Sequence, residues 1–191
     1  MTEITHKFDQ LPPAIQRFIL QWGDMGGQWG VNRTIAQIHA LLYVSDRPLN
    51  AEDIAETLGV ARSNVSNSLK ELQAWKIVKR VPVPGDRRDH FAAEDDVWEM
   101  AMRIANIRKE RELNPALETL EACLAEAEND SRVSATQKAR LEAMQEFTGS
   151  MDRWYEQMLK VPPATLLRMI KMGNKIVGLL GFGAKAQKPE T

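Results

Sequence analysis

The sequence has little of what several classes of protein depend on. Its 191 residues include one cysteine, Cys123, so no disulfide can form within the chain and we expect a reducing compartment. The N-terminus lacks the basic and apolar stretches of a signal peptide, and the apolar run 176–182 is too short to span a bilayer. These absences predict a cytoplasmic protein.

Patterns that support catalysis are missing as well. The sequence contains no glycine-rich phosphate-binding loop, no Cys/His cluster and no candidate Ser-His-Asp triad. Its three histidines do not have the spacing of metal ligands, so His39 is interpreted as a packed or surface side chain. The sequence therefore predicts a protein that is not an enzyme and that has no metal or cofactor.

Positive charge is concentrated in one stretch, although the whole chain has a net charge of −1. Residues 62–91 hold seven basic side chains (Arg62, Lys70, Lys76, Lys79, Arg80, Arg87 and Arg88) and three acidic ones (Glu71, Asp86 and Asp89). A local cluster of cations in a nearly neutral protein suits a site-specific nucleic-acid binder better than a coating protein.

The same stretch has the spacing of a helix-turn-helix. Asn50 can cap a short helix that ends at Leu58, and Gly59 supplies the backbone freedom of a tight turn. A second helix is predicted from Arg62 to about Lys76, with apolar residues at positions 65, 69 and 72 on one face. Its other face is polar and cationic, which suits base edges and phosphates. That face and its flanks hold Arg62, Ser63, Asn64, Ser66, Asn67 and Lys70.

A β-hairpin is predicted directly after the second helix. Residues 77–83 are rich in β-branched side chains, Pro84-Gly85-Asp86 indicates a turn, and residues 90–92 form another short run. Arg87 and Arg88 lie at the predicted tip, where a wing contacts phosphates or the minor groove. Residues 31–93 are thus expected to form a winged helix-turn-helix that binds double-stranded DNA. The alternative is a winged-helix protein-interaction scaffold without specific DNA readout, although protein interfaces favour aromatic and aliphatic anchors over this polar face.

Several short motifs extend this interpretation. They are SDRPL at 45–49, GVARSNVS at 59–66, VPGDRRD at 83–89, DVWEM at 96–100 and Asn114-Pro115. Together and in this order they resemble the GbsR branch of the MarR-type winged-helix transcriptional regulators, over at least residues 25–125. One departure is Ala61, where the family commonly has Ser; the missing N-cap oxygen costs about 1 kcal/mol of helix stability. The resemblance implies a homodimeric regulator that acts as a repressor.

Two apolar seams lie near opposite ends of the chain. Residues 11–22 and 166–180 carry apolar side chains at alternating spacings of four and three. One domain of this size rarely needs both seams for its own core, so we expect a helical dimerisation layer. The predicted divisions are an N-terminal helix contributing to dimerisation (1–30), the DNA-binding domain (31–93), a helical linker with a C-terminal dimerisation region (94–182) and a disordered tail (183–191). The predicted fold class is mainly α with a small β-hairpin wing.

Helical sequence outside the DNA-binding domain leaves room for a small-molecule effector. Such a ligand would act where the wing domain meets the dimer layer, and it would lower operator affinity. The aromatic residues expected there are Trp22, Trp29, Tyr43, Trp98 and Tyr155, and the plainer interpretation is that they pack the core. Aromatic faces suit cation–π contacts, and the resemblance points to choline-type compounds, so a cationic or amphipathic effector is expected. Cys123 lies on an apolar stripe beside acids, which favours a packed cysteine over a thiol redox sensor.

Overall fold

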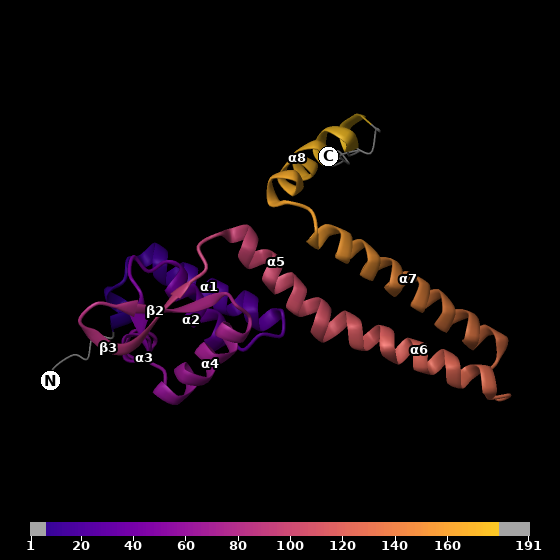
Figure 1. Ribbon diagram of the computed structural model, residues 1–191, viewed down its shortest axis with the longest axis horizontal. Helices are drawn as coiled ribbons and strands as arrows, with labels where there is room; N and C mark the ends of the chain where they lie inside the picture. Colours follow the sequence, from indigo (N-terminus) through magenta and orange to yellow (C-terminus); the bar gives the residue numbers. More distant parts are fainter. Residues whose placement is uncertain (1–6, 180–191) are drawn as a thin grey trace, which may run out of the picture. The chain divides into compact units, whose positions relative to one another are not determined.

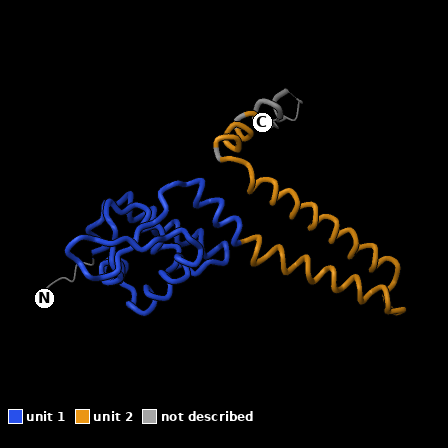
Figure 2. Tube along the Cα trace, in the orientation of Figure 1, with its two compact units in different colours: residues 1–107 blue, residues 108–191 orange. Residues whose placement is uncertain are grey.

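The computed structural model describes residues 7–179, and it divides the chain into two compact units, unit 1 (residues 1–107) and unit 2 (residues 108–191) (Figures 1 and 2). The predicted tail 183–191 and Leu180 of the second seam lie outside the described residues. The described part is mainly helical with one three-stranded antiparallel sheet, which confirms the predicted fold class. No helix within it is long and apolar enough to cross a membrane.

Unit 1 begins with a short 3-10 helix, η1 (Lys7–Gln10), and two helices that pack against each other, α1 (Pro13–Gln28) and α2 (Arg33–Tyr43). Glycine allows their close approach, because a Cβ built on Gly26 would lie 2.5 Å from Cβ of Ala36. Helix α1 ends before Gly30, whose φ of 77° suits glycine.

The apolar side chains of the first seam pack within unit 1. Leu11, Ile15, Phe18 and Trp22 pack against the buried core, which is built mainly from α2 and the helix-turn-helix. The N-terminal helix therefore belongs to the same compact unit as the DNA-binding domain, although the sequence interpretation divided them at residue 30. A contribution of this helix to dimerisation stays a prediction.

The helix-turn-helix consists of α3 (Ala51–Leu58) and α4 (Arg62–Ala74). The predicted cap of α3 is confirmed: the Asn50 side chain accepts hydrogen bonds from the backbone N–H groups of Glu52 at 2.9 Å and Asp53 at 3.0 Å. The predicted turn is confirmed too, because Gly59 adopts the left-handed conformation with φ 64°. These two features fix where α3 begins and ends, and they set the start of α4.

The sheet has the strand order β1-β3-β2, with β1 (Leu49–Asn50), β2 (Val78–Val83) and β3 (Asp86–Ala93) all antiparallel. The sequence did not predict β1, since two residues carry no periodic pattern. The turn is only Pro84-Gly85, so Arg87 and Arg88 lie inside β3 and not at the tip as predicted. Neighbouring side chains of a strand point to opposite faces, so these two arginines have different surroundings.

Helix α5 (Val97–Arg108) is followed directly by a π-helical turn, η2 (Lys109–Leu113), and then by α6 (Asn114–Asn129). An Asn-Pro pair is typical of the cap and first residue of a new helix, but Asn114 is no cap here, because its dihedrals are helical (φ −60°, ψ −49°). Its side-chain oxygen instead accepts a hydrogen bond from Lys109 Nζ at 3.0 Å. We attribute the difference to the π-helical turn, whose wider register lets Pro115 follow without ending the helix.

In unit 2, α6 packs against α7 (Ala135–Leu159), and α8 (Pro163–Leu179) follows (Figure 1). Helix α7 starts with a capping box: Gln137 N–H donates to Ser134 Oγ at 3.2 Å, and Ser134 N–H donates to Gln137 Oε1 at 2.9 Å. An ion pair of 2.7 Å joins Lys109 Nζ to Asp152 Oδ1 and fastens η2 to α7.

Candidate nucleic-acid interface

Helix α4 presents a polar face because its apolar side chains are used in the core. Val65, Leu69 and Leu72 are 0%, 2% and 1% exposed. All six residues predicted to face DNA from this helix are exposed: Arg62, Ser63, Asn64, Ser66, Asn67 and Lys70. The helix starts without a side-chain cap, since Ala61 makes no such hydrogen bond. The sequence therefore predicted both the exposed face of α4 and its uncapped start.

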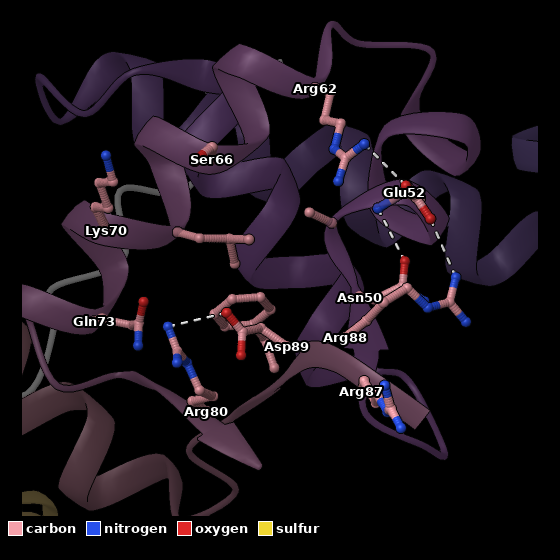
Figure 3. A pocket seen from close by; sticks show the side chains of 13 residues that line it. Asn50, Glu52, Arg62, Ser66, Lys70, Gln73, Arg80, Arg87, Arg88 and Asp89 are labelled. Atoms are coloured by element: carbon pink, nitrogen blue, oxygen red, sulfur yellow. Dashed lines mark hydrogen bonds and ion pairs between the residues drawn. The ribbon is translucent and has the colours of Figure 1, made fainter. Parts of the chain in front are cut away.

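A groove of about 510 Å³ lies between α4 and the wing (Figure 3). Arg62, Ser66 and Lys70 line it from α4, and Arg87 and Arg88 line it from β3. The structure thus brings cations from the helix and the wing to one concave surface. The remaining predicted residues, Ser63, Asn64 and Asn67, occupy exposed positions of α4 that do not line the groove.

Sequence reasoning missed several residues of this groove, among them Glu52, Gln73, Arg80 and Asp89. Gln73 had a usable signal, since it follows Lys70 at the helical i+3 spacing and so lies on the same face. Arg80 and Asp89 become neighbours only through the pairing of β2 with β3, and they form an ion pair of 3.1 Å. Glu52 belongs to α3, and only the tertiary fold brings it to the groove.

Carboxylates hold several of the arginines in the groove. Glu52 bridges two of them, with Oε1 2.9 Å from Arg62 Nη1 and Oε2 3.1 Å from Arg88 Nη1. Arg88 also forms an ion pair of 2.5 Å with Asp86. Hydrogen bonds from Arg88 hold the pKa of the Asp86 carboxyl well below its usual range, and bonds to Asp86 and Glu52 raise the pKa of Arg88. Both groups are therefore charged at neutral pH.

Two other cations of the groove are not paired with a carboxylate. Within residues 7–179, Lys70 and Arg87 make no ion pair with a carboxylate. Both side chains are exposed on the concave surface. The groove therefore combines free cations, which can bind phosphate directly, with arginines that are already neutralised by acids.

The predicted aromatic residues do not line one common cavity. Trp22 and Trp29 line a small apolar cavity of about 70 Å³ in unit 1, together with Trp75, which the sequence analysis did not select. Tyr43 stacks on His39, with ring centroids 6.3 Å apart, and is not part of the lining. Tyr155 belongs to unit 2, where it lines a separate groove with Phe147 and Met151. Trp98 is a half-buried residue of α5 that lines neither site.

His39 lines this apolar cavity and is 3% exposed. Its Nε2 atom is buried without a hydrogen-bond partner among the residues that the structure describes. Burial lowers the pKa of His39 to about 4, because the charged form is poorly solvated there. The imidazole is therefore neutral near pH 7, with one nitrogen left to bind a ligand or water. The expectation of a packed histidine is confirmed.

Comparisons with known proteins agree with this geometry. Residues 29–89 match the sequence model of the MarR family. The chain is 24% identical over 98 residues to the HTH-type transcriptional repressor GbsR of Bacillus subtilis, covering 51% of this chain and 54% of that protein. It is 21% identical over 86 residues to the putative HTH-type transcriptional regulator YvaV of the same organism, covering 45% and 49%. The chain thus spans about half the length of the curated relatives it matches.

A solved structure shows the same fold. The crystal structure of a transcriptional regulator covers 77% of this chain and 96% of its own, with a TM-score of 0.59 and 18% identity. The family match spans the helix-turn-helix and reaches into β3, so it includes both sides of the groove. The winged helix-turn-helix of this chain is therefore similar to the MarR family and to the GbsR and YvaV regulators, in agreement with the resemblance seen in the sequence motifs.

Proposed function

We propose that this protein is a transcriptional regulator that binds double-stranded DNA at specific sequences. The observation that carries the proposal is the exposed polar face of α4 beside a groove lined by cations of both the helix and the wing. Amide and hydroxyl groups such as those of Asn67 and Ser63 read base edges in the major groove, while Lys and Arg hold the phosphates. The similarity to GbsR and YvaV supports the same function.

The direct test is to select binding sequences from a random DNA library with the full chain and then to weaken one readout group. Asn67→Ala should cost about 1–3 kcal/mol on the selected sequence and little on random DNA. Gln157→Ala, which removes an exposed amide from α7, is the matched control and should change neither affinity. Equal losses on both DNAs would show that Asn67 does not read bases.

A protein-interaction scaffold without specific DNA readout is the second candidate. The surface of α4 speaks against it, because its exposed residues are polar and charged, whereas protein interfaces concentrate aromatic and aliphatic anchors. Selection that enriches no sequence, with wild-type protein that is folded, would favour the scaffold over the regulator.

We further propose that two copies associate through unit 2. A row of large apolar side chains on one side of α7 is exposed, namely Met144, Phe147, Met151 and Trp154. Met169, Ile170 and Met172 of α8 are exposed as well. Large apolar surfaces of this kind mark interaction sites. A twofold dimer would present two α4 helices to successive turns of DNA, roughly 34 Å apart.

In the proposed regulation the protein represses transcription, and a small effector relieves this repression. Repression is inferred from the similarity to GbsR, which is a repressor. The cavity beside His39 supports the effector, since it offers tryptophan faces and one unpaired, neutral nitrogen. No carboxylate lines it, so of the two expected classes it favours an amphipathic ligand over a purely cationic one. Trp29 is 52% exposed, which leaves room for the ligand to extend beyond the small cavity.

This effector proposal is tested by fluorescence and by DNA binding together. Choline and small aromatic alcohols are titrated into the complex with the selected DNA, while tryptophan emission is recorded. The expected result is quenching by the aromatic alcohols and a lower DNA affinity, both of which His39→Leu should reduce. Quenching that is unaffected by His39→Leu would place the ligand elsewhere.

A further inference from the structure

Glu52 is an acid among the cations of the groove, and its two oxygens bind different arginines. Oε1 lies 2.9 Å from Arg62, the first residue of α4, and Oε2 lies 3.1 Å from Arg88 in β3 (Figure 3). One side chain of α3 therefore joins the start of the recognition helix to the wing. Residues on three separate elements meet here, so no local pattern of the sequence indicates this bridge.

The position of Glu52 is fixed by the fold. Its backbone N–H donates to the side chain of Asn50 at 2.9 Å, so the residue sits in the capped first turn of α3. Two residues later, Ile54 is fully buried and anchors that turn in the core. The carboxylate is thus presented to both arginines by a rigid element, and the bridge does not depend on a mobile loop.

Stability does not account for this arrangement. The three side chains of the bridge are all substantially exposed, and exposed ion pairs contribute about 0–1 kcal/mol. An acid beside a phosphate-binding surface also repels DNA. Glu52 adds little stability and opposes DNA binding, so we expect its effect in the difference between specific and non-specific DNA affinity.

We propose that Glu52 is a specificity-determining residue, which occupies Arg62 and Arg88 in the free protein and thereby disfavours DNA of arbitrary sequence more than the cognate site. The proposal rests on the DNA-binding function proposed above. Non-specific binding consists almost entirely of phosphate contacts and the counterions they release. An arginine paired with Glu52 is not free to neutralise a phosphate and release that phosphate's counterion, so it adds little to the affinity for random DNA.

A cognate sequence differs because base contacts hold α4 deep in the major groove. Arg62 then lies close to the DNA, and it exchanges Glu52 for a phosphate or a base edge. Random DNA lacks those base contacts, so it is bound mainly by the unpaired cations Lys70 and Arg87. Asp86 provides a second carboxylate for Arg88, so Arg62 is the arginine that depends most on Glu52.

The test compares wild type with Glu52→Gln on random and on selected DNA across a range of salt concentrations. Glu52→Gln should raise the affinity for random DNA about fivefold or more at 0.1 M salt. It should also steepen the slope of log K against log salt by about 0.9 for each arginine that gains a phosphate. The affinity for selected DNA should rise less, so the ratio of specific to non-specific binding falls. Glu52→Asp keeps the charge and should restore part of the wild-type slope.

Glu56→Gln is the matched control. It makes the same change of charge one turn further along α3, where the carboxylate pairs with Lys7 and does not line the groove. Its salt slope should equal that of the wild type, and both variants should unfold at the wild-type temperature. An unchanged slope for Glu52→Gln, or equal gains on the two DNAs, overturns the proposal. A wild type that binds neither DNA rejects the proposed function itself, which is a different result.

Discussion

The two units of the chain differ in how far they bury their apolar side chains. Unit 1 has a continuous core that includes Ile19, Ile38, Ile54 and Leu72, each almost fully buried. In the described part of unit 2 no residue is buried. Unit 1 thus has a buried core of its own, while the described part of unit 2 leaves large apolar side chains exposed.

This contrast explains why the two seams seen in the sequence have different roles. The apolar side chains of α1 pack against the core of unit 1, so the first seam finds its packing partner within the same chain. In the second seam, Ile170 is 58% exposed, so among the described residues its side chain is not packed into a core. A seam in the sequence predicts that a helix packs on something, and only the fold shows whether that partner lies in the same chain.

The largest expected effect is a difference in the free energy of unfolding between the same apolar substitution made in unit 1 and in unit 2. Ile38→Ala, at a fully buried position of unit 1, should lower the free energy of unfolding by about 2–5 kcal/mol. Ile170→Ala makes the same chemical change in unit 2 at a side chain that is 58% exposed, and it should cost less than about 0.5 kcal/mol in dilute solution. Urea unfolding followed by circular dichroism measures both. Similar losses would contradict the contrast between the units.

A pH effect is expected from the buried His39 of unit 1, the unit that contains all three histidines of the chain. Burial lowers the pKa of His39 to about 4 from 6.5, so between these values the unfolded chain binds a proton that the folded chain does not. Stability therefore falls as the pH drops from about 6.5 to 4, by up to about 3 kcal/mol in total.

His39→Leu removes this titrating group, and its unfolding free energy should depend less on pH over the same window. Denaturant unfolding at several pH values compares the variant with the wild type. A variant with the full wild-type pH dependence would show that another group is responsible.

Association tests the exposed apolar surface of unit 2. Replacing Phe147 and Trp154 together by Ala should weaken self-association by about 2 kcal/mol, which is about thirtyfold, since large aromatic side chains dominate interfaces. Leu20→Ala removes an exposed apolar side chain from α1 of unit 1 and is the control. Sedimentation over a range of concentrations gives both constants. A larger effect of Leu20→Ala would move the interface to α1.

The smallest expected effect concerns helix caps, which also differ between the units. Helix α7 has a complete capping box at Ser134, whereas α4 starts at Ala61 without a side-chain cap. Ala61→Ser should therefore stabilise unit 1 by about 0.5–1 kcal/mol, and Ser134→Ala should destabilise α7 by a similar amount. Thermal unfolding of both variants measures this. A neutral Ala61→Ser would show that the start of α4 does not need the oxygen.

The sequence alone determined the features that depend on neighbours along the chain. The cap at Asn50, the turn at Gly59, the buried positions of α4 and its exposed polar face all follow from local chemistry and helical spacing. The family resemblance likewise came from short motifs, and the match over residues 29–89 agrees with it. Patterns of this kind involve only a few neighbouring residues, so they can be recognised without knowledge of the fold.

Only the tertiary structure decided which distant residues meet. The strand β1 exists because Leu49 finds Phe91 as a partner, and the Glu52 bridge exists because α3, α4 and β3 converge. The cavity beside His39 likewise joins tryptophans of α1 to Trp75 after α4. Contacts between segments far apart in the chain depend on how the helices pack, and packing depends on the fit of many side chains at once. No single stretch of sequence contains that information.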